Sequence, residues 1–205
     1  MHRIEDAITN VFLLWMLTVP HEFAHAWAAD RLGDDTPRNE GRLTLNPLAH
    51  VDWIGTVLVP AVISLFGGGL LGWGRAVNTS PWKLRGGLSG LALVALAGPA
   101  SNIVFAFVLA AAVALTSAAW PAVAALAARA LWLSIFLALF NLLPVPPLDG
   151  SKLLLAARLP VRLYEELARF GFLLILVAMT STSLGHWMSA ASWTVARGIL
   201  GLFVR

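Results

Sequence analysis

Long apolar stretches constrain this chain more than any other feature of its sequence. Five of them approach or exceed the roughly 20 residues that a helix needs to cross a bilayer. They cover about residues 5–32, 90–117, 121–143, 161–182 and 184–205. Hydrophobic residues make up 59% of the 205 residues and charged residues only 12%, unlike an ordinary soluble domain. We therefore predict one all-α polytopic membrane domain over residues 1–205, with about five transmembrane helices. The last helix also suits a position at the membrane interface.

The first apolar stretch contains the sequence His-Glu-Phe-Ala-His at residues 21–25. Side chains four positions apart share one face of a helix, so His21 and His25 can hold one Zn²⁺ between them. Glu22 lies beside the first histidine, close enough to act as base for a water on that ion. A chance match and a pair of hydrogen-bonded core histidines are the alternatives. Such polar groups are costly in a membrane helix without a function, which favours the metal site.

A third metal ligand is expected because catalytic zinc sites commonly have three protein ligands and one open position. The chain has no cysteine, so that ligand must be a histidine or a carboxylate. Asp149 is the best candidate, since it is the only acidic residue between Asp52 and Glu165. A turn or helix cap before Gly150 is the alternative role, and both roles are compatible. His50 and Asp52 are weaker candidates, which we expect to form a solvated loop pair.

Two asparagines lie within or at the end of apolar helices. Asn102 follows Gly98-Pro99, which we expect to interrupt its helix, and Asn141 lies near the end of the next helix. Each amide suits hydrogen bonding to its own helix or between helices. Each also suits donation to a substrate or to a developing oxyanion, which we favour.

The stretch 51–66 is apolar but short, and it contains Gly55 and Pro60. It either crosses the membrane or is re-entrant and returns to its starting side. Alternating residues in 42–45 predict a short strand before it, and residues 73–79 predict another extended piece after it. Irregular backbone at membrane depth is tolerated where protein buries it.

The positions of the basic residues favour the re-entrant alternative. In that arrangement twelve of the 14 Lys and Arg residues lie on one side of the membrane, and only Arg3 and Arg129 lie on the other. The positive side faces the cytoplasm, so the N-terminus is expected outside and the C-terminus inside a multi-pass cell-membrane protein. His21, His25 and Asp149 then lie at one depth near the cytoplasmic face.

The chain is basic overall, with a pI of about 10.2. Its basic residues flank apolar stretches, which is typical of anchoring at an anionic lipid surface rather than of nucleic-acid binding. We therefore expect the lipid bilayer as a partner and no nucleic acid.

Three motifs together resemble the site-2 protease family of intramembrane zinc metalloproteases. They are HExxH at residues 21–25, Gly-Pro-Ala-Ser-Asn at residues 98–102, and Asn-Leu-Leu-Pro-Val-Pro-Pro-Leu-Asp-Gly at residues 141–150. The stretches 41–47 and 72–77 look like the compact bacterial and archaeal branch that lacks PDZ and CBS domains. HExxH alone is a moderate signal, whereas the three motifs in this order are a strong one.

The resemblance implies a catalytic core of three helices, at about residues 5–32, 90–117 and 121–150, with peripheral helices at about 161–205. It implies one Zn²⁺ held by His21, His25 and Asp149, with Glu22 as general base. Asn102 and Asn141 match the asparagines that position the substrate or its oxyanion, and strands near Leu43 and Val77 offer an edge for an unwound substrate.

The implied function is hydrolysis of peptide bonds in a transmembrane or membrane-associated protein substrate, near the cytoplasmic side of the bilayer. A membrane metal-ion transporter or sensor is the alternative, because intramembrane histidine and aspartate also mark ion pathways. The clustering of the polar residues at one depth, beside a base, favours hydrolysis.

Overall fold

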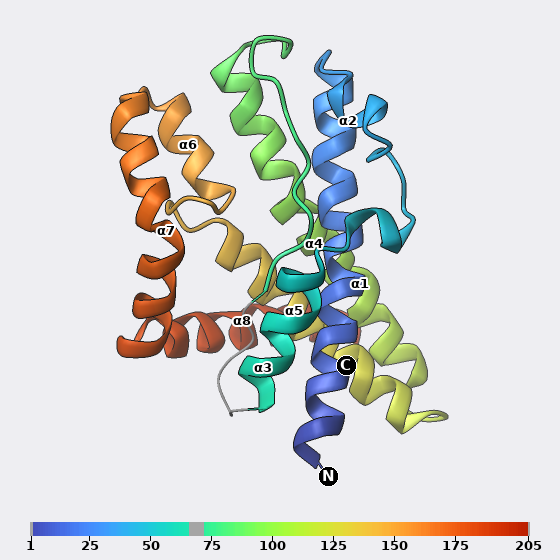
Figure 1. The fold of residues 1–205 in the computed structure, drawn as a ribbon. Coiled ribbons are helices and arrows are strands. Elements are labelled where there is room, and N and C mark those ends of the chain that lie inside the picture. Colours follow the sequence, from blue (N-terminus) through green and yellow to red (C-terminus); the bar gives the residue numbers. More distant parts are fainter. Residues whose placement is uncertain (1, 66–71, 205) are drawn as a thin grey trace.

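The computed structural model describes residues 2–65 and 72–204 and shows a bundle of helices (Figure 1). Its centre is formed by three helices, α1 (His2–Arg31), α4 (Leu88–Thr116) and α5 (Pro121–Asn141). Two more long helices follow, α7 (Val161–Ser181) and α8 (Leu184–Leu200). The short elements are α2 (Thr36–Asn39), the 3-10 helix η1 (Pro47–His50), the π-helix η2 (Trp53–Leu58), α3 (Val59–Leu65) and α6 (Gly150–Ala156).

The central helices pack through small and aliphatic side chains. Ala106 and Ala110 of α4 are fully buried against Leu131 and Ile135 of α5. Small residues allow helix backbones to approach closely, as in membrane bundles. A second apolar cluster joins α1 to α5 and consists of Leu13, Leu14, Leu17, Ala130, Leu133 and Leu137. The two clusters hold α1, α4 and α5 together and fix the relative positions of the polar residues that these helices carry.

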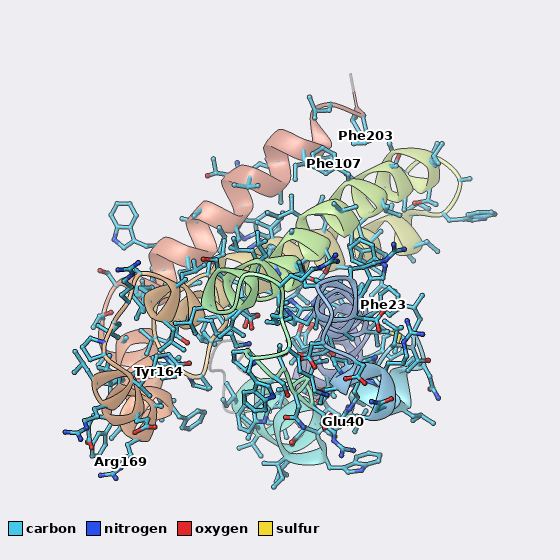
Figure 2. The ribbon with its side chains drawn as sticks, turned by 90° about the horizontal axis from the view of Figure 1, so that it is seen from above. Phe23, Glu40, Phe107, Tyr164, Arg169 and Phe203 are labelled. Atoms are coloured by element: carbon cyan, nitrogen blue, oxygen red, sulfur yellow. The ribbon has the colours of Figure 1, made fainter. Side chains whose placement is uncertain are left out.

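The last two long helices lie at the periphery of the bundle. They meet at a bend of 78°, and α8 runs across the bundle against α4 and α5 (Figure 1). Seen from above, α7 with Tyr164 and Arg169 stands at one edge of the molecule, away from Phe23 of α1 (Figure 2). Gly171 lets α7 approach the loop before α6, because a Cβ there would stand 1.7 Å from the carbonyl oxygen of Pro146.

Fewer helices than expected have the length and composition of a membrane span. Within the described residues α4 and α5 qualify, and the bent pair α7–α8 would raise the number to three. The prediction of about five spans is therefore not supported in full. The 30 residues of α1 are long enough to cross a bilayer, but this helix carries the polar sequence of residues 21–25. The apolar helices fit a membrane protein.

The short apolar stretch after η1 folds back on itself. It forms η2 and α3, and the chain then returns beside them from Gly72 onward. The backbone N–H of Trp73 donates to the carbonyl of Gly55, and that of Arg75 donates to the carbonyl of His50, both at 3.0 Å. The two ends of this segment therefore lie side by side.

The predicted strands near Leu43 and Val77 are wrong, because the described residues contain no β-strand. Residues 42–45 do not bury alternate apolar side chains, since Arg42 is 4% exposed and Leu45 is 60% exposed. Residues 72–80 form an irregular segment without regular secondary structure, and its amides bond to η1, η2 and side chains rather than to another strand. Alternation in the sequence predicts a strand only where a partner strand is available.

The expected interruption of the second central helix at Gly98-Pro99 is also wrong. Pro99 lies inside the continuous α4. Proline removes one backbone hydrogen bond from a helix, and helices that pack against neighbours in a membrane bundle tolerate this loss. The hydroxyl of Ser101 donates to the carbonyl of Gly98 at 2.7 Å and to that of Pro20 on α1 at 3.2 Å. α1 and α4 are therefore joined where both carry a proline.

Candidate metal centre

The two histidines of α1 lie one turn apart and present the same ring nitrogen to one point. The Nε2 atoms of His21 and His25 are 3.1 Å apart, and the rings meet edge to face. Both residues are buried, with 4% and 5% of their surface exposed. Two nitrogens so close in an apolar bundle indicate a shared ligand rather than separate hydrogen bonds.

Asp149 completes the group from the opposite side of the bundle. It precedes α6, which follows the proline-rich loop after α5. Its Oδ2 lies 3.1 Å from Nε2 of His21 and 3.0 Å from Nε2 of His25. The carboxylate is buried, and these three residues form a group that can hold a metal ion. The structure therefore brings together the three residues predicted as ligands, although more than a hundred positions separate the histidines from the aspartate.

The second ring nitrogen of each histidine, Nδ1, contacts a polar group of α4. Nδ1 of His25 lies 2.7 Å from the carbonyl of Val94, and Nδ1 of His21 lies 3.3 Å from the amide of Asn102. An acceptor at Nδ1 fixes the tautomer in which Nε2 is free to bind a metal. The buried Oδ1 of Asn102 has no hydrogen-bond partner within the described structure. If the side-chain amide is rotated by 180°, Oδ1 replaces the amide nitrogen beside His21 and accepts a hydrogen bond from Nδ1. Both rings are thus oriented for ligation through Nε2.

A glycine of α4 makes room for the histidine rings. A Cβ on Gly98 would stand 2.3 Å from Nε2 of His25 and 2.7 Å from Cε1 of His21. Both imidazoles therefore rest on the bare backbone of α4, at the sequence position where the sequence alone predicted a helix break.

The donor set fits a zinc ion. Tetrahedral bonds of about 2.0–2.1 Å place ligand atoms about 3.3 Å apart, and the observed separations are 3.0 to 3.1 Å. Two imidazole nitrogens and one carboxylate oxygen form a common ligand set of catalytic zinc sites. The group therefore offers three protein ligands to such an ion, beside the cavity described next.

An apolar cavity of about 480 Å³ opens beside the three ligands. Glu22 lines it and is 7% exposed, and its Oε2 accepts a hydrogen bond from the backbone N–H of Val77 at 3.2 Å. Apolar side chains from α5, the 72–80 segment and α7 form most of the walls. The lining also includes Thr18, Trp73, Leu137, Phe140, Asn141, Leu148, Phe172 and Ile175. A carboxylate beside a metal group in such a cavity is the arrangement that hydrolysis by an activated water requires.

The two asparagines occupy different places. Asn141 lines the cavity, and its amide nitrogen donates to the carbonyl of Leu137 on its own helix at 3.0 Å. Asn102 is fully buried behind His21 and is absent from the cavity lining. Asn141 therefore lies where it can contact a molecule in the cavity, whereas Asn102 lies where it contacts the candidate metal ligand His21.

The expected solvated pair of His50 and Asp52 is not formed. His50 is fully buried, with Nε2 2.8 Å from the carbonyl of Thr44. Asp52 caps η2 by accepting hydrogen bonds from the backbone N–H groups of Ile54 and Gly55. Neither residue belongs to the metal group.

Lys152 is a site residue that the sequence analysis missed. Its Nζ donates to Oδ1 of Asp149 at 2.9 Å, and the side chain lines the cavity. The sequence did offer a signal for this residue. Helix N-termini disfavour positive charge, so a lysine in the first turn of a helix, three positions after the candidate ligand Asp149, indicates that its charge has a nearby partner.

Comparisons with known proteins identify a family and several relatives of this chain. The family model of peptidase family M50 matches residues 115–179. A relative from Bacillus subtilis (strain 168), named "Putative zinc metalloprotease YwhC", is 40% identical over 144 residues, which cover 65% of this chain and 62% of the relative. The chain thus spans less than two thirds of that relative's length.

Longer matches are found in mycobacteria, with two relatives named "Putative zinc metalloprotease Rip2". The protein of Mycolicibacterium smegmatis is 32% identical over 87% of this chain and 71% of its own length. That of Mycobacterium tuberculosis (strain H37Rv) is 31% identical over 88% of this chain and 72% of its own length. No solved structure matches the chain. With HExxH and Asp149 joined in one centre and relatives matched over most of their length, the chain belongs to peptidase family M50, the site-2 protease family.

Proposed function

We propose that this chain is an intramembrane zinc metalloprotease, which hydrolyses peptide bonds of membrane-protein segments near the cytoplasmic side of the bilayer. The observation that carries the proposal is the meeting of His21, His25 and Asp149 at one point, with the carboxylate of Glu22 lining the same apolar cavity. Membership of peptidase family M50 and the names of the relatives support the same activity.

The chemistry of the site is divided between the ion and the side chains of the chain. Bound Zn²⁺ lowers the pKa of a coordinated water and polarises a carbonyl oxygen. Glu22 takes up a proton from the attacking water at its carboxylate and later gives it to the leaving amine. The N–H of Val77 holds one oxygen of Glu22, which fixes the direction of the carboxylate. Asn141 contacts the substrate from the cavity wall.

The 72–80 segment provides a backbone edge along which a substrate can lie. The N–H groups of Trp73, Arg75 and Val77 bond to Gly55, His50 and Glu22 respectively. Gly72, Gly74 and Ala76 of the same segment also line the cavity. A substrate peptide that unwinds and pairs with this edge satisfies its own backbone groups inside the membrane.

The distribution of the charges and one ion pair support a topology for the proposed protease. Arg129 of α5 donates to Asp6 at 2.8 Å and to Asn10 at 2.8 and 3.1 Å, which joins it to the N-terminal end of α1. Several basic residues of the following loops gather at the other end of α1, where Arg38 pairs with Asp30 and Arg85 donates to the carbonyl of Arg31. We infer that this second end faces the cytoplasm and that the cavity receives water from there.

The proposal is tested with the Glu22→Gln variant. Glutamine keeps the shape of the side chain but cannot take up a proton, so zinc content should equal that of the wild type while cleavage of a membrane-anchored reporter falls by at least about 100-fold. The matched control is Glu166→Gln, which changes an exposed glutamate on α7 that lies 3.5 Å from Arg169, and which should cleave normally.

Cleavage by Glu22→Gln at the wild-type rate would refute the role of Glu22. Zinc transport in liposomes by purified protein that does not cut any reporter would favour the transporter alternative.

A further inference from the structure

We propose that Lys152 is a positioning residue of the metal centre. Its ammonium group holds Oδ1 of Asp149, so that Oδ2 is the oxygen presented to the ion together with the two histidines. The inference rests on the proposed zinc site, and it adds a residue to that site which no motif of the sequence identifies.

The two oxygens of Asp149 have separate partners. Oδ1 accepts from Nζ of Lys152 at 2.9 Å, whereas Oδ2 lies 3.1 and 3.0 Å from the histidine nitrogens. A hydrogen bond between charged groups is stronger than one between neutral groups. The ammonium group therefore binds Oδ1 of Asp149, and Oδ2 is left to bind the ion.

Close packing and hydrogen bonds fix the backbone on both sides of Asp149. The side-chain torsion angles of Asp149 are then the main freedom that its carboxylate retains. A Cβ on Gly150 would stand 2.2 Å from the carbonyl oxygen of Leu142, which shows how tightly the start of α6 packs on the preceding loop. The hydroxyl of Ser151 donates to the carbonyl of Leu148 at 2.6 Å. Lys152 restrains the remaining freedom, the rotation of the Asp149 carboxylate, and ligands held in advance lose less entropy when an ion binds.

The contact differs from an ordinary surface ion pair between neighbours on a helix. The Asp149 side chain is 10% exposed and that of Lys152 is 30% exposed, so water screens the pair little. Lysine in the first turn opposes the helix dipole, and Lys152 is the only Lys or Arg in the lining of the cavity as described. A basic side chain at this position is thus unfavourable for α6 alone and is offset by the contact with the ligand.

The experiment compares Lys152→Met and Lys152→Arg in the full chain, purified in detergent and carrying Glu22→Gln so that turnover plays no part. The matched control is Lys83→Met, since Lys83 is the other lysine of the chain and pairs with Asp35 at 2.6 Å, away from the metal group. The zinc dissociation constant is measured by chelator competition, and the visible absorption of the cobalt(II) form reports the ligand arrangement.

We expect Lys152→Met to weaken zinc binding by about 10- to 100-fold and to change the cobalt spectrum. Lys152→Arg should recover most of the affinity, because arginine also donates to a carboxylate, and Lys83→Met should bind like the parent. Equal affinity and equal cobalt spectra for Lys152→Met and the parent would overturn the proposal.

A second measurement separates positioning from substrate contact. With Glu22 intact, activity lost in Lys152→Met should return at high zinc concentration with KM unchanged. A raised KM with unaltered zinc affinity would assign Lys152 to the substrate instead and overturn the proposal. Zinc affinity is measured without cleavage, so a failure of the protease assignment would leave this result readable by itself.

Discussion

The backbone of Gly98 on α4 lies against the imidazole of His25 on α1, so that a Cβ at Gly98 would stand 2.3 Å from the ligating nitrogen. This contact sets the distance between the two helices at the level of the metal centre. It also explains why the helix that passes behind the centre carries a glycine there, where alanine would otherwise stabilise a helix.

We predict that Gly98→Ala abolishes stoichiometric zinc binding, because the added methyl group displaces the histidine rings. The same overpacking should destabilise the protein by about 1–3 kcal/mol. Gly198→Ala is the matched control, since a Cβ at Gly198 of α8 meets nothing within 4 Å, and it should bind zinc normally. Zinc content by elemental analysis and thermal unfolding check both variants, and full zinc occupancy in Gly98→Ala would contradict the prediction.

Asn102 and Asn141 should differ in what their removal changes. Asn102 contacts Nδ1 of His21, so Asn102→Ala should weaken zinc binding by about 10- to 100-fold. Asn141 lines the cavity, so Asn141→Ala should keep zinc affinity and lower kcat/KM. Chelator competition and reporter cleavage measure the two quantities. The assignment fails if Asn102→Ala binds zinc like the wild type and loses activity only.

Gly55 and Trp73 are predicted to be energetically coupled. A Cβ on Gly55 would stand 2.2 Å from Nε1 of Trp73, and the indole also meets Phe172 of α7 at 5.6 Å between ring centroids. Gly55→Ala should therefore destabilise the protein by about 1–3 kcal/mol.

In a Trp73→Ala background, Gly55→Ala should lower the free energy of unfolding only slightly, because the indole ring that the added methyl group would meet is then absent. A double-mutant cycle by chemical denaturation measures the coupling energy, which we expect at about 0.5–3 kcal/mol. Additive effects of the two substitutions would show that the ring does not rest on Gly55.

His50 should make stability depend on pH. Burial lowers the pKa of His50 below its ordinary value, and the nearby Arg42 lowers it further. Below about pH 6.5 His50 is therefore protonated in the unfolded chain but stays neutral in the folded chain until the pH reaches its lowered pKa. The contribution of His50 to stability is thus present above that pH and is lost as the pH falls toward the lowered pKa.

His50→Gln removes this titration and leaves a donor for the carbonyl of Thr44. The melting temperature of the zinc-loaded wild type should therefore fall more between pH 7.5 and 5.5 than that of the variant. Parallel pH profiles for the two proteins would exclude a buried neutral His50.

Local patterns predicted part of this architecture from sequence. The ranges of the five long helices follow from continuous apolar stretches, and the ligand set follows from the spacing of His21 and His25 and the isolation of Asp149. The predicted strands near Leu43 and Val77 were wrong because alternation does not supply a partner strand. The predicted break at Gly98-Pro99 was wrong because the buried α4 tolerates the one backbone hydrogen bond that Pro99 removes.

The sequence by itself determined which residues have metal-binding chemistry and which segments are helical, because both depend on residue type and on spacing within a few turns. Only the tertiary structure decided which helix faces meet. Those contacts place Asp149 within 3.1 Å of both histidines, leave room for the rings at Gly98, and direct Lys152 to the second oxygen of Asp149. Contacts between distant segments depend on the packing of all the helices together, and no local pattern records them.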